Sequence, residues 1–282
     1  MGSPDQDRLL SPTAPAEDHE HLSFDTSVSH PARRYNYWLG GKDNFAADRA
    51  SGDAIAQVIP TIRLSALENR RFLSRAVSYL AREAGVRQFL DIGTGIPAAN
   101  NTHEVAQSIA PESRVVYVDN DPIVLVHARA LLRGQGGKIA YLDADLREPE
   151  SILGDPALTA TLDLTQPVGL MLIAILHFLR DETRPFDIVR QLLDALPAGS
   201  FLAVSHATHD FMAPGQAEEA GANDPSFQFR SKDEFAQFFE GVELVEPGIT
   251  SIAHWRAESE PEPRPSAAEV SAYGAVGRLP QR

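Results

Sequence analysis

The sequence contains no cysteine, which excludes disulfide bonds, thiolate metal sites and a cysteine nucleophile. It also has no excess of positive charge: 25 Lys and Arg residues stand against 39 Asp and Glu residues, a formal net charge of −14. Proteins that bind nucleic acid rely on Lys and Arg contacts to phosphate groups. The acidic composition therefore disfavours a nucleic-acid partner.

Long hydrophobic runs are missing as well. The longest apolar run, "VGLMLIAILHFL" (168–179), is shorter than the roughly 20 residues that a membrane-spanning helix needs. The first residues also lack the basic and then apolar pattern of a signal peptide. With 43% hydrophobic and 23% charged residues, the chain has an ordinary globular composition. We therefore expect a cytoplasmic protein with no membrane contact.

The chain divides into three parts by its pattern of apolar residues. Residues 1–23 have few periodic apolar positions and are expected to form a flexible tail. Residues 24–63 are interpreted as an N-terminal cap segment, and residues 64–282 as the main domain. Within that domain, the Pro- and Gly-containing stretch 208–230 is expected to be an insertion or a lid.

Strand and helix patterns alternate from residue 64 onward. We predict helices over 64–83, 98–110, 121–133, 183–196 and 231–241. We predict strands over 87–93, 114–120, 138–146, 167–176, 199–207, 242–248 and 269–279. This alternation is typical of a doubly wound α/β fold. We therefore expect a mostly parallel seven-stranded sheet with helices on both faces, an N-terminal helical extension, and an antiparallel pair formed by the last two strands.

The first predicted strand runs into a glycine-rich turn, "LDIGTGIP" (90–97). Glycines allow a ligand to approach the backbone, and a helix that opens after such a turn offers free N–H groups. The spacing of Gly93, Gly95 and Ala98 also fits a loose dinucleotide-binding pattern. A tight turn with no ligand would show the same glycines, so this motif alone decides nothing.

Carboxylates stand at the ends of the next two predicted strands. Asp119 follows Gly95 by 24 residues, a spacing suited to binding ribose hydroxyls. In "DADL" (143–146), either Asp143 or Asp145 could face an adenine ring, and the sequence leaves that choice open. The first strand adds Asp91, where a nicotinamide-binding fold usually has an apolar residue. A carboxylate there suits a ligand that carries an ammonium group.

These motifs, "DIGTG", "YVDND", "DADL" and "LPAGSFLAVSH", together resemble class I S-adenosylmethionine-dependent methyltransferases. The longer segments "RRYNYWLGGKDNFAADR", "FLDIGTGIPAANNTHEVA" and "VVYVDNDPIVLVHARALL" resemble one bacterial branch, a former family of unknown function described as S-adenosyl methyltransferase-like. The resemblance runs from about residue 24 to the end. It implies the fold and S-adenosylmethionine as cofactor, and it implies no particular methyl acceptor.

The resemblance also implies which residues bind the cofactor. Asp91, Gly93 and Gly95 are expected to hold the methionine moiety, and Asp119 the ribose hydroxyls. One departure from the common pattern is the pair "IP" (96–97), which replaces the third small residue of the glycine turn and would stiffen it.

The same resemblance places the adenine and the reacting methyl group. Asn120, Asp145 and Leu146 are expected beside the adenine. The segment from Ala174 to His177, after the fourth strand, is expected under the sulfonium. His177 is our candidate for a catalytic base or positioning residue, although a packed structural histidine would give the same pattern.

Other histidines give weaker signals. His206 and His209 follow the fifth strand and are alternative bases. Possible metal ligands occur in "EDHEH" (17–21) and "HATHD" (206–210), but the spacing of neither cluster favours a metal site, and we predict none.

The stretch "RRYNYWLGG" (33–41) precedes the first predicted helix. One interpretation makes it a lid, in which Arg33 or Arg34 pairs with the methionine carboxylate and the aromatic residues wall the acceptor pocket. On this interpretation we assign Arg34, Tyr35 and Gly41 to the cofactor site, with Gly40 and Gly41 allowing a tight turn. The alternative is an amphipathic helix packed on the sheet.

Three functions remain compatible with these patterns. The leading hypothesis is an S-adenosylmethionine-dependent methyltransferase that acts on a small molecule. The second is a regulator that binds the same cofactor and transfers nothing. The third, a nicotinamide-dependent oxidoreductase, is disfavoured by Asp91. The oligomeric state is left open.

Overall fold

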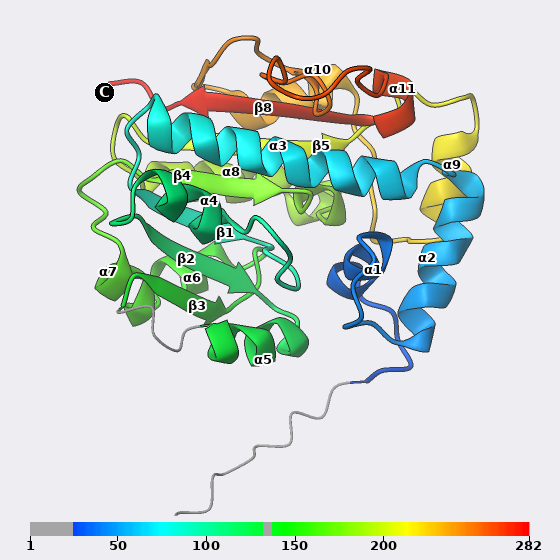
Figure 1. The fold of residues 1–282 in the computed structure, drawn as a ribbon, viewed down its shortest axis with the longest axis horizontal. Helices are drawn as coiled ribbons and strands as arrows, with labels where there is room; N and C mark the ends of the chain where they lie inside the picture. Colours follow the sequence, from blue (N-terminus) through cyan, green and yellow to red (C-terminus); the bar gives the residue numbers. More distant parts are fainter. Residues whose placement is uncertain (1–24, 132–136, 282) are drawn as a thin grey trace, which may run out of the picture.

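The computed structural model describes residues 25–131 and 137–281. Their centre is a sheet with the strand order β3-β2-β1-β4-β5-β8-β6, in which the short β7 pairs with β8 (Figure 1). The strands are β1 (Gln88–Ile92), β2 (Arg114–Asp119), β3 (Ile139–Asp143), β4 (Gly169–Ile173), β5 (Phe201–Ala207), β6 (Glu243–Leu244), β7 (Thr250–Ser251) and β8 (Ala272–Arg278). The expected tail over 1–23 lies outside the described residues.

β1 to β5 are parallel, and β8 runs antiparallel to β5, β6 and β7. The predicted α/β class, the mostly parallel sheet and the antiparallel ending are therefore confirmed. The predicted count of seven strands was wrong by one, since the described sheet has eight strands. The extra strand, β7, is only two residues long and forms by pairing with β8, so local sequence carries little signal for it.

Helices occupy both faces of the sheet and the region beyond its carboxyl edge. They are α1 (Pro31–Trp38), α2 (Ala46–Val58), α3 (Ile62–Arg82), α4 (Thr102–Ile109), α5 (Pro122–Leu131), α6 (Pro149–Leu153), α7 (Pro156–Thr161), α8 (Pro185–Asp194), α9 (Gln216–Ala222), α10 (Lys232–Ala236) and α11 (Ala267–Val270). Three-residue 3₁₀ turns complete the elements: η1 (Leu176–Phe178), η2 (Asp181–Thr183) and η3 (Gln237–Phe239). No helix among the described residues is long and apolar enough to cross a membrane.

Alternate residues of the buried strands supply two separate cores, because successive side chains of a strand point to opposite faces. Phe89 of β1 and Tyr117 of β2 belong to the core under α3, together with Leu73 and Val77 of that helix. Their strand neighbours, such as Leu90, belong to the core on the α8 side. Figure 1 shows the long α3 crossing one face while α6 and α8 lie behind the other.

The helix after the glycine turn begins later than the sequence suggested. We predicted a helix over 98–110, whereas α4 starts at Thr102. Asn101 and Glu104 form a capping box at its start, and Asn100 has a positive φ of 60° that ends the preceding loop. The expectation that the glycine turn opens directly into a helix was therefore wrong. A loop that includes Pro97 separates the two.

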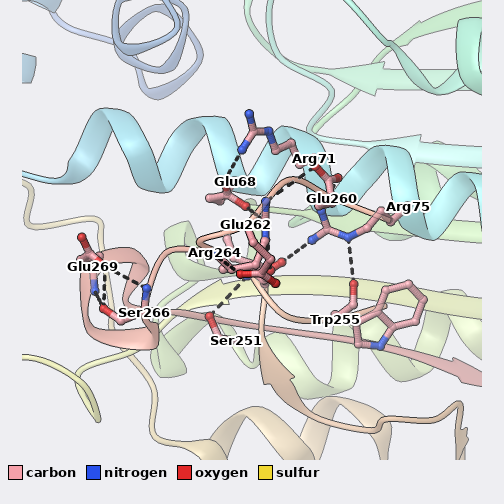
Figure 2. Close-up of polar contacts among 12 residues, drawn as sticks. Glu68, Arg71, Arg75, Ser251, Trp255, Glu260, Glu262, Arg264, Ser266 and Glu269 are labelled. Carbon is pink, nitrogen blue, oxygen red and sulfur yellow. Dashed lines mark hydrogen bonds and ion pairs between the residues drawn. The ribbon is translucent and has the colours of Figure 1, made fainter. Parts of the chain in front are cut away.

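A buried network of charged side chains ties the C-terminal segment to α3 (Figure 2). The fully buried carboxylate of Glu68 pairs with Arg71 on its own helix and with Arg264. Arg264 also donates to the carbonyl of Ala253, at 3.1 Å from Nε and 2.9 Å from Nη2. Arg75, one turn beyond Arg71 on α3, pairs with Glu260 at 2.9 Å. These contacts hold the segment between β7 and β8 against α3.

We expect Arg264→Ala to lower the free energy of unfolding by about 3 to 5 kcal/mol, because the substitution leaves the buried Glu68 carboxylate without its buried partner. Arg71→Ala is the matched control. It removes the other partner of Glu68. Because the Arg71 side chain is 39% exposed, its loss should cost less than about 1 kcal/mol. Urea denaturation of the two variants measures both values. Equal small losses would contradict this description of the network.

Candidate functional site

A cavity of about 350 Å³ lies at the carboxyl ends of the parallel strands. This is the edge of an open α/β sheet where ligands bind. All predicted site residues except Gly41 contribute to its wall: Arg34, Tyr35, Asp91, Gly93, Gly95, Asp119, Asn120, Asp145, Leu146, Ala174 and His177. The N-terminal helix α1 lies between this edge and α2 (Figure 1), so the cap segment encloses the cavity.

The glycine turn is shaped by contacts that exclude larger residues. Gly93 has a φ of 75°, and a Cβ there would come within 2.5 Å of the Ile175 side chain. Gly95 has a φ of 67°, and its N–H donates to Asp119 at 2.7 Å. The α1 residue Ala32 lies 4.0 Å from where a Cβ of Gly95 would stand. The turn is therefore held between the end of β2, the end of β4 and α1.

Asp91 carries a buried carboxylate that no cation neutralises directly. Its side chain accepts a hydrogen bond from the Thr102 hydroxyl at 2.6 Å and is 4% exposed. Burial raises the pKa of Asp91 to about 6, although the Thr102 hydrogen bond and the charge of Arg70 oppose this rise. An ammonium group placed beside Asp91 would relieve the cost of its ionised form. The site thus fits the predicted methionine amino group.

The ends of β2 and β3 hold three further polar groups. Asp119 accepts from the backbone N–H of Asp121 at 2.9 Å as well as from the glycine turn, and burial raises its pKa. The Asn120 side chain donates to Asp145 at 3.0 Å. The sequence left open whether Asp143 or Asp145 faces the site. Asp145 lines the cavity, whereas Asp143 is exposed and lies outside it.

Asp145 is an ionised surface carboxylate. It forms an ion pair with Arg147, and hydrogen bonds from the Arg147 side chain lower its pKa to about 2. Arg147 also lines the cavity. Asp145 therefore stays charged across the ordinary pH range and holds Asn120 in place.

A chain of hydrogen bonds links α1 to the end of β4. The Tyr35 hydroxyl donates to the carbonyl of Ala66 at 2.9 Å and accepts from Asn69 at 2.9 Å. The Ser205 hydroxyl donates to Asn69 at 2.5 Å and accepts from the N–H of Ala174 at 2.9 Å. Ala174 has a φ of 55°, an unfavourable conformation for a residue with a Cβ, and such strain collects at functional sites. The chain fixes this strained position on the cavity wall.

His177 lies just beyond that position, enclosed by aromatic rings. Its ring centroid is 4.4 Å from Phe227, 4.5 Å from Phe178 and 5.5 Å from His206. Its Nδ1 is buried and has no hydrogen-bond partner among the described residues. Burial holds the pKa of His177 well below 6.5, and the nearby His206, Arg230 and Arg34 lower it further. The imidazole is therefore neutral at pH 7 and has a ring nitrogen able to accept a hydrogen bond.

His206, our alternative base, is locked in a structural role. Its Nδ1 lies 2.7 Å from the carbonyl of Ala207, and its Nε2 lies 2.8 Å from Nη1 of the buried Arg230. A guanidinium can only donate, so the Nε2 of His206 is unprotonated and already used as an acceptor. His209, the other alternative, is not on the cavity wall. His177 remains the candidate.

The basic pair at the start of α1 differs from what we expected. Arg33 lies 3.3 Å from the Asp121 carboxylate, and Arg34 pairs with Asp224 in the 208–230 insertion. Arg34 Nε and two donors of Arg33, Nε and Nη1, are buried without a hydrogen-bond partner in the described structure. Gly41 lies outside the cavity, and a Cβ there would overlap the Asn36 side chain, so it serves the turn between α1 and α2. Arg34 lines the cavity, and its expected role toward the cofactor, like that of Gly41, stays a prediction.

Arg70 is the residue that the sequence analysis missed. It projects from α3 to the cavity wall, where its Nη2 donates to the carbonyls of Ala99 at 3.0 Å and Asn100 at 2.9 Å. Its Nε is buried with no partner in the described structure. The signal was present in the helical spacing: Ala66, Asn69, Arg70 and Leu73 share the face of α3 that lines the cavity.

An apolar compartment forms the other end of the cavity, where α1, α2 and the insertion meet. We call it the acceptor chamber. Its wall consists of Trp38, Ile55, Ile59, Ile62, Met212, Ala220 and Phe229. Across residues 25–131 and 137–281, no group of three or more His, Asp or Glu side chains is placed to hold a metal ion. The "EDHEH" cluster (17–21) lies outside these residues.

The strand order and the site at the carboxyl edge define a Rossmann-like methyltransferase fold. The family model described as S-adenosyl methyltransferase matches residues 17–280, so the chain belongs to this family and is an S-adenosylmethionine-dependent methyltransferase. A DUF574 family protein from Streptomyces avermitilis is 48% identical, with a TM-score of 0.84, and the match covers 91% of this chain and 99% of that one.

Two further structures extend the comparison. A protein from Thermobifida fusca, named as a candidate methyltransferase, is 42% identical over 91% of this chain and 97% of its own, with a TM-score of 0.85. An O-methyltransferase family protein from Burkholderia thailandensis, at 15% identity, shares the fold with a TM-score of 0.51 over 87% of this chain and 64% of its own. The search of curated proteins found no match.

The raised pKa of Asp91 has a consequence for stability. A carboxyl whose pKa rises from 3.8 when unfolded to about 6 when folded destabilises the folded state once it ionises, by an amount on the order of 3 kcal/mol. This cost begins near pH 3.8 and is complete above about pH 6. We expect Asp91→Asn to raise the free energy of unfolding, more at pH 8 than at pH 5 by on the order of 1 to 2 kcal/mol.

Denaturant unfolding at the two pH values measures this difference. Asp143→Asn removes an exposed carboxylate two strands away along the sheet edge and is the control. A pH-independent effect of Asp91→Asn would mean that the buried, ionised Asp91 carboxylate does not destabilise the folded protein.

Proposed function

We propose that the protein transfers the methyl group of S-adenosylmethionine to a small-molecule acceptor. The observation that carries this proposal is the single cavity that joins the glycine turn and the strand-end carboxylates to the acceptor chamber. Its volume of about 350 Å³ lies within the range of small-ligand sites. α1, α2 and the insertion enclose the chamber, and such walls suit a small acceptor better than a segment of a macromolecule.

The cofactor end offers complementary charges for an amino-acid moiety. Asp91 would bind the ammonium group, and we assign the carboxylate to Arg70, which takes the role first expected of Arg34. Both groups line the cavity and contact the start of α4, where Arg70 Nη2 donates to Asn101 at 3.3 Å and Thr102 donates to Asp91 at 2.6 Å. Together they would bind one zwitterion. Asp119 would accept from the ribose hydroxyls through its remaining lone pairs.

The adenine would lie between the ends of β2 and β3, beside Asn120 and Leu146. Asp145 would act mainly through Asn120, to which it is hydrogen-bonded at 3.0 Å. Tyr35 would contribute only its aromatic ring to the cavity wall, because its hydroxyl is already hydrogen-bonded to Ala66 and Asn69. Ala174 would present its strained backbone near the reacting carbon.

When bound, the cofactor supplies an electrophilic methyl group on a positively charged sulfur. The chain would supply alignment, exclusion of water and a place for the acceptor's proton. His177 suits the last role, since it is neutral at pH 7 and stands on the cavity wall next to Ala174. Enclosure by Phe178 and Phe227 would keep water from the reacting atoms.

The assignment of the cofactor groups predicts different responses to two ligands. S-Adenosylhomocysteine carries the amino-acid moiety, and 5′-methylthioadenosine lacks it. We expect Asp91→Asn and Arg70→Met each to weaken S-adenosylhomocysteine binding at least about tenfold and to leave 5′-methylthioadenosine binding unchanged, because each removes a charge-assisted contact. Asp119→Asn should weaken both ligands, because both carry the ribose.

Titration calorimetry with the two ligands measures these affinities. Asp143→Asn is the control and should match the unmodified protein, since Asp143 lies outside the cavity. Absence of S-adenosylhomocysteine binding to the unmodified protein would reject the proposed cofactor site. An equal effect of Arg70→Met on both ligands would reject only the assignment of Arg70.

The role of the site in catalysis can be tested without knowing the acceptor. A cell extract incubated with the protein and methyl-tritiated S-adenosylmethionine should yield more labelled small product than an extract without the protein, measured after a filter has removed macromolecules and cation exchange has removed the unreacted cofactor. His177→Gln should reduce this label by about 10²- to 10⁴-fold, the usual effect of losing a general base, with unchanged S-adenosylhomocysteine affinity. Label retained with protein or nucleic acid would contradict a small acceptor. Tight cofactor binding with no labelled product would favour a regulator.

A further inference from the structure

The wall of the acceptor chamber is apolar, and the cavity wall also carries two opposite charges, Arg34 and Asp224, that neutralise each other. Its aliphatic and aromatic side chains come from α1, α2 and the 208–230 insertion, among them Trp38, Ile59 and Phe229. Arg34 and Asp224 also line the cavity, and they form a buried ion pair with each other. The remaining charged side chains of the cavity wall belong to the strand-end region already described.

The ion pair is deeply buried and joins parts of the chain 190 residues apart. The side chains of Arg34 and Asp224 are 6% and 10% exposed. Asp224 also accepts from the N–H and the hydroxyl of Ser226, at 3.1 and 2.5 Å. Arg34, Asp224 and His177 all line the cavity. Phe227, which follows Asp224 closely in the chain, packs against His177 with ring centroids 4.4 Å apart, so the segment that carries Asp224 reaches the candidate base.

We infer that the methyl acceptor is an uncharged, planar aromatic molecule that carries a hydroxyl group. This inference rests on the methyl transfer proposed above. A charged acceptor would be buried with no opposite charge left to pair with, because the charges of Arg34 and Asp224 already neutralise each other, and an unpaired buried charge is strongly unfavourable. Arg34 Nε has no hydrogen-bond partner in the described structure and offers one N–H donor. The rings of Trp38, Phe227 and Phe229 favour a flat apolar body, since aromatic rings pack by stacked and edge-to-face contacts. His177, whose Nδ1 also has no partner there, is the group that would accept from the hydroxyl.

The reaction that follows is balanced without a further reactant. The hydroxyl oxygen forms a bond to the methyl carbon as the bond from sulfur to that carbon breaks, and sulfur keeps the electron pair as a neutral thioether. The hydroxyl proton passes to the imidazole of His177 and then to water. An acceptor with a hydroxyl suits this arrangement, because a neutral imidazole can take up one proton as the oxygen–carbon bond forms.

Calorimetry with two probes tests the inference. The probes are 2-naphthol, which is uncharged at pH 7, and 6-hydroxy-2-naphthoate, which adds a carboxylate to the same rings. Each is titrated into the full chain saturated with S-adenosylhomocysteine. We expect 2-naphthol to bind and the carboxylated probe to bind at least about 30-fold more weakly, because its charge finds no free cation.

A charge-exposing variant sharpens the test. Asp224→Asn leaves Arg34 without its partner, so the carboxylated probe should gain at least about tenfold in affinity while 2-naphthol changes little. The double variant Arg34→Gln with Asp224→Asn is the matched control, in which the chamber is neutral again and the gain should disappear. Mass spectrometry of a turnover mixture with 2-naphthol should show its methyl ether.

Each outcome decides something. Equal or tighter binding of the carboxylated probe to the unmodified protein would overturn the inference, and so would no binding of 2-naphthol to a protein that binds S-adenosylhomocysteine. In both cases the proposed cofactor site would stand. Failure of S-adenosylhomocysteine itself to bind would overturn the proposed function and this inference together. The comparison of the two probes on the unmodified protein decides the matter even where Asp224→Asn does not fold.

Discussion

The buried carboxylate of Asp121 holds the N-terminal cap on the sheet, and the enclosed cavity depends on this attachment. Asp121 lies 3.0 Å from His30 Nδ1 and 3.3 Å from Arg33 Nε, and it also accepts from the N–H of Ile123 at the start of α5. Burial alone would raise its pKa, but the contacts with His30, Ile123 and Arg33 lower it overall. One charged group therefore fixes α1, the start of α5 and the end of β2 together.

Asp48 extends this attachment from α1 to α2. It is fully buried and accepts from the backbone N–H groups of His30 and Phe45, at 2.9 and 2.8 Å. The same two helices then supply Trp38, Ile55 and Ile59 to the acceptor chamber. The polar corner and the apolar chamber are thus opposite ends of one unit. Charge pairs give the unit its position, and its hydrophobic side chains give it a binding surface.

The sequence predicted the sheet well, and its candidate cofactor residues gather at one sheet edge, for a physical reason. Glycine at a turn with positive φ, and a carboxylate at a strand end, are local requirements that leave a fixed spacing in the sequence. Gly93, Gly95 and Asp119 accordingly line the cavity as expected. The start of α10 is equally local: Ser231 and Glu234 form a capping box, and the helix begins at Lys232, inside the predicted range 231–241.

The errors concern features that depend on distant contacts. The ion pair of Arg34 with Asp224 was not predicted, because the two residues lie 190 positions apart and no local pattern links them. The strand β7 exists only because β8 pairs with it. Arg70 sits in an ordinary amphipathic helix, and only the tertiary fold brings it to the loop at Ala99. Long-range pairing of charges and strands is information that a single sequence does not display.

The two ends of the cavity differ in whether their buried charges are paired. At the cofactor end, Asp91 is buried without a cation in direct contact, and its raised pKa shows that the protein tolerates this cost. At the acceptor end, the charges of Arg34 and Asp224 cancel inside the protein. An unpaired buried charge is stabilised when a ligand of opposite sign binds beside it, whereas a charge that is already paired gains little from such a ligand. The cofactor would therefore be selected by charge, and the acceptor by shape and by a single hydrogen bond. The strand-end groups stand in motifs that the sequence displays, whereas the apolar chamber is built from helices that carry no motif.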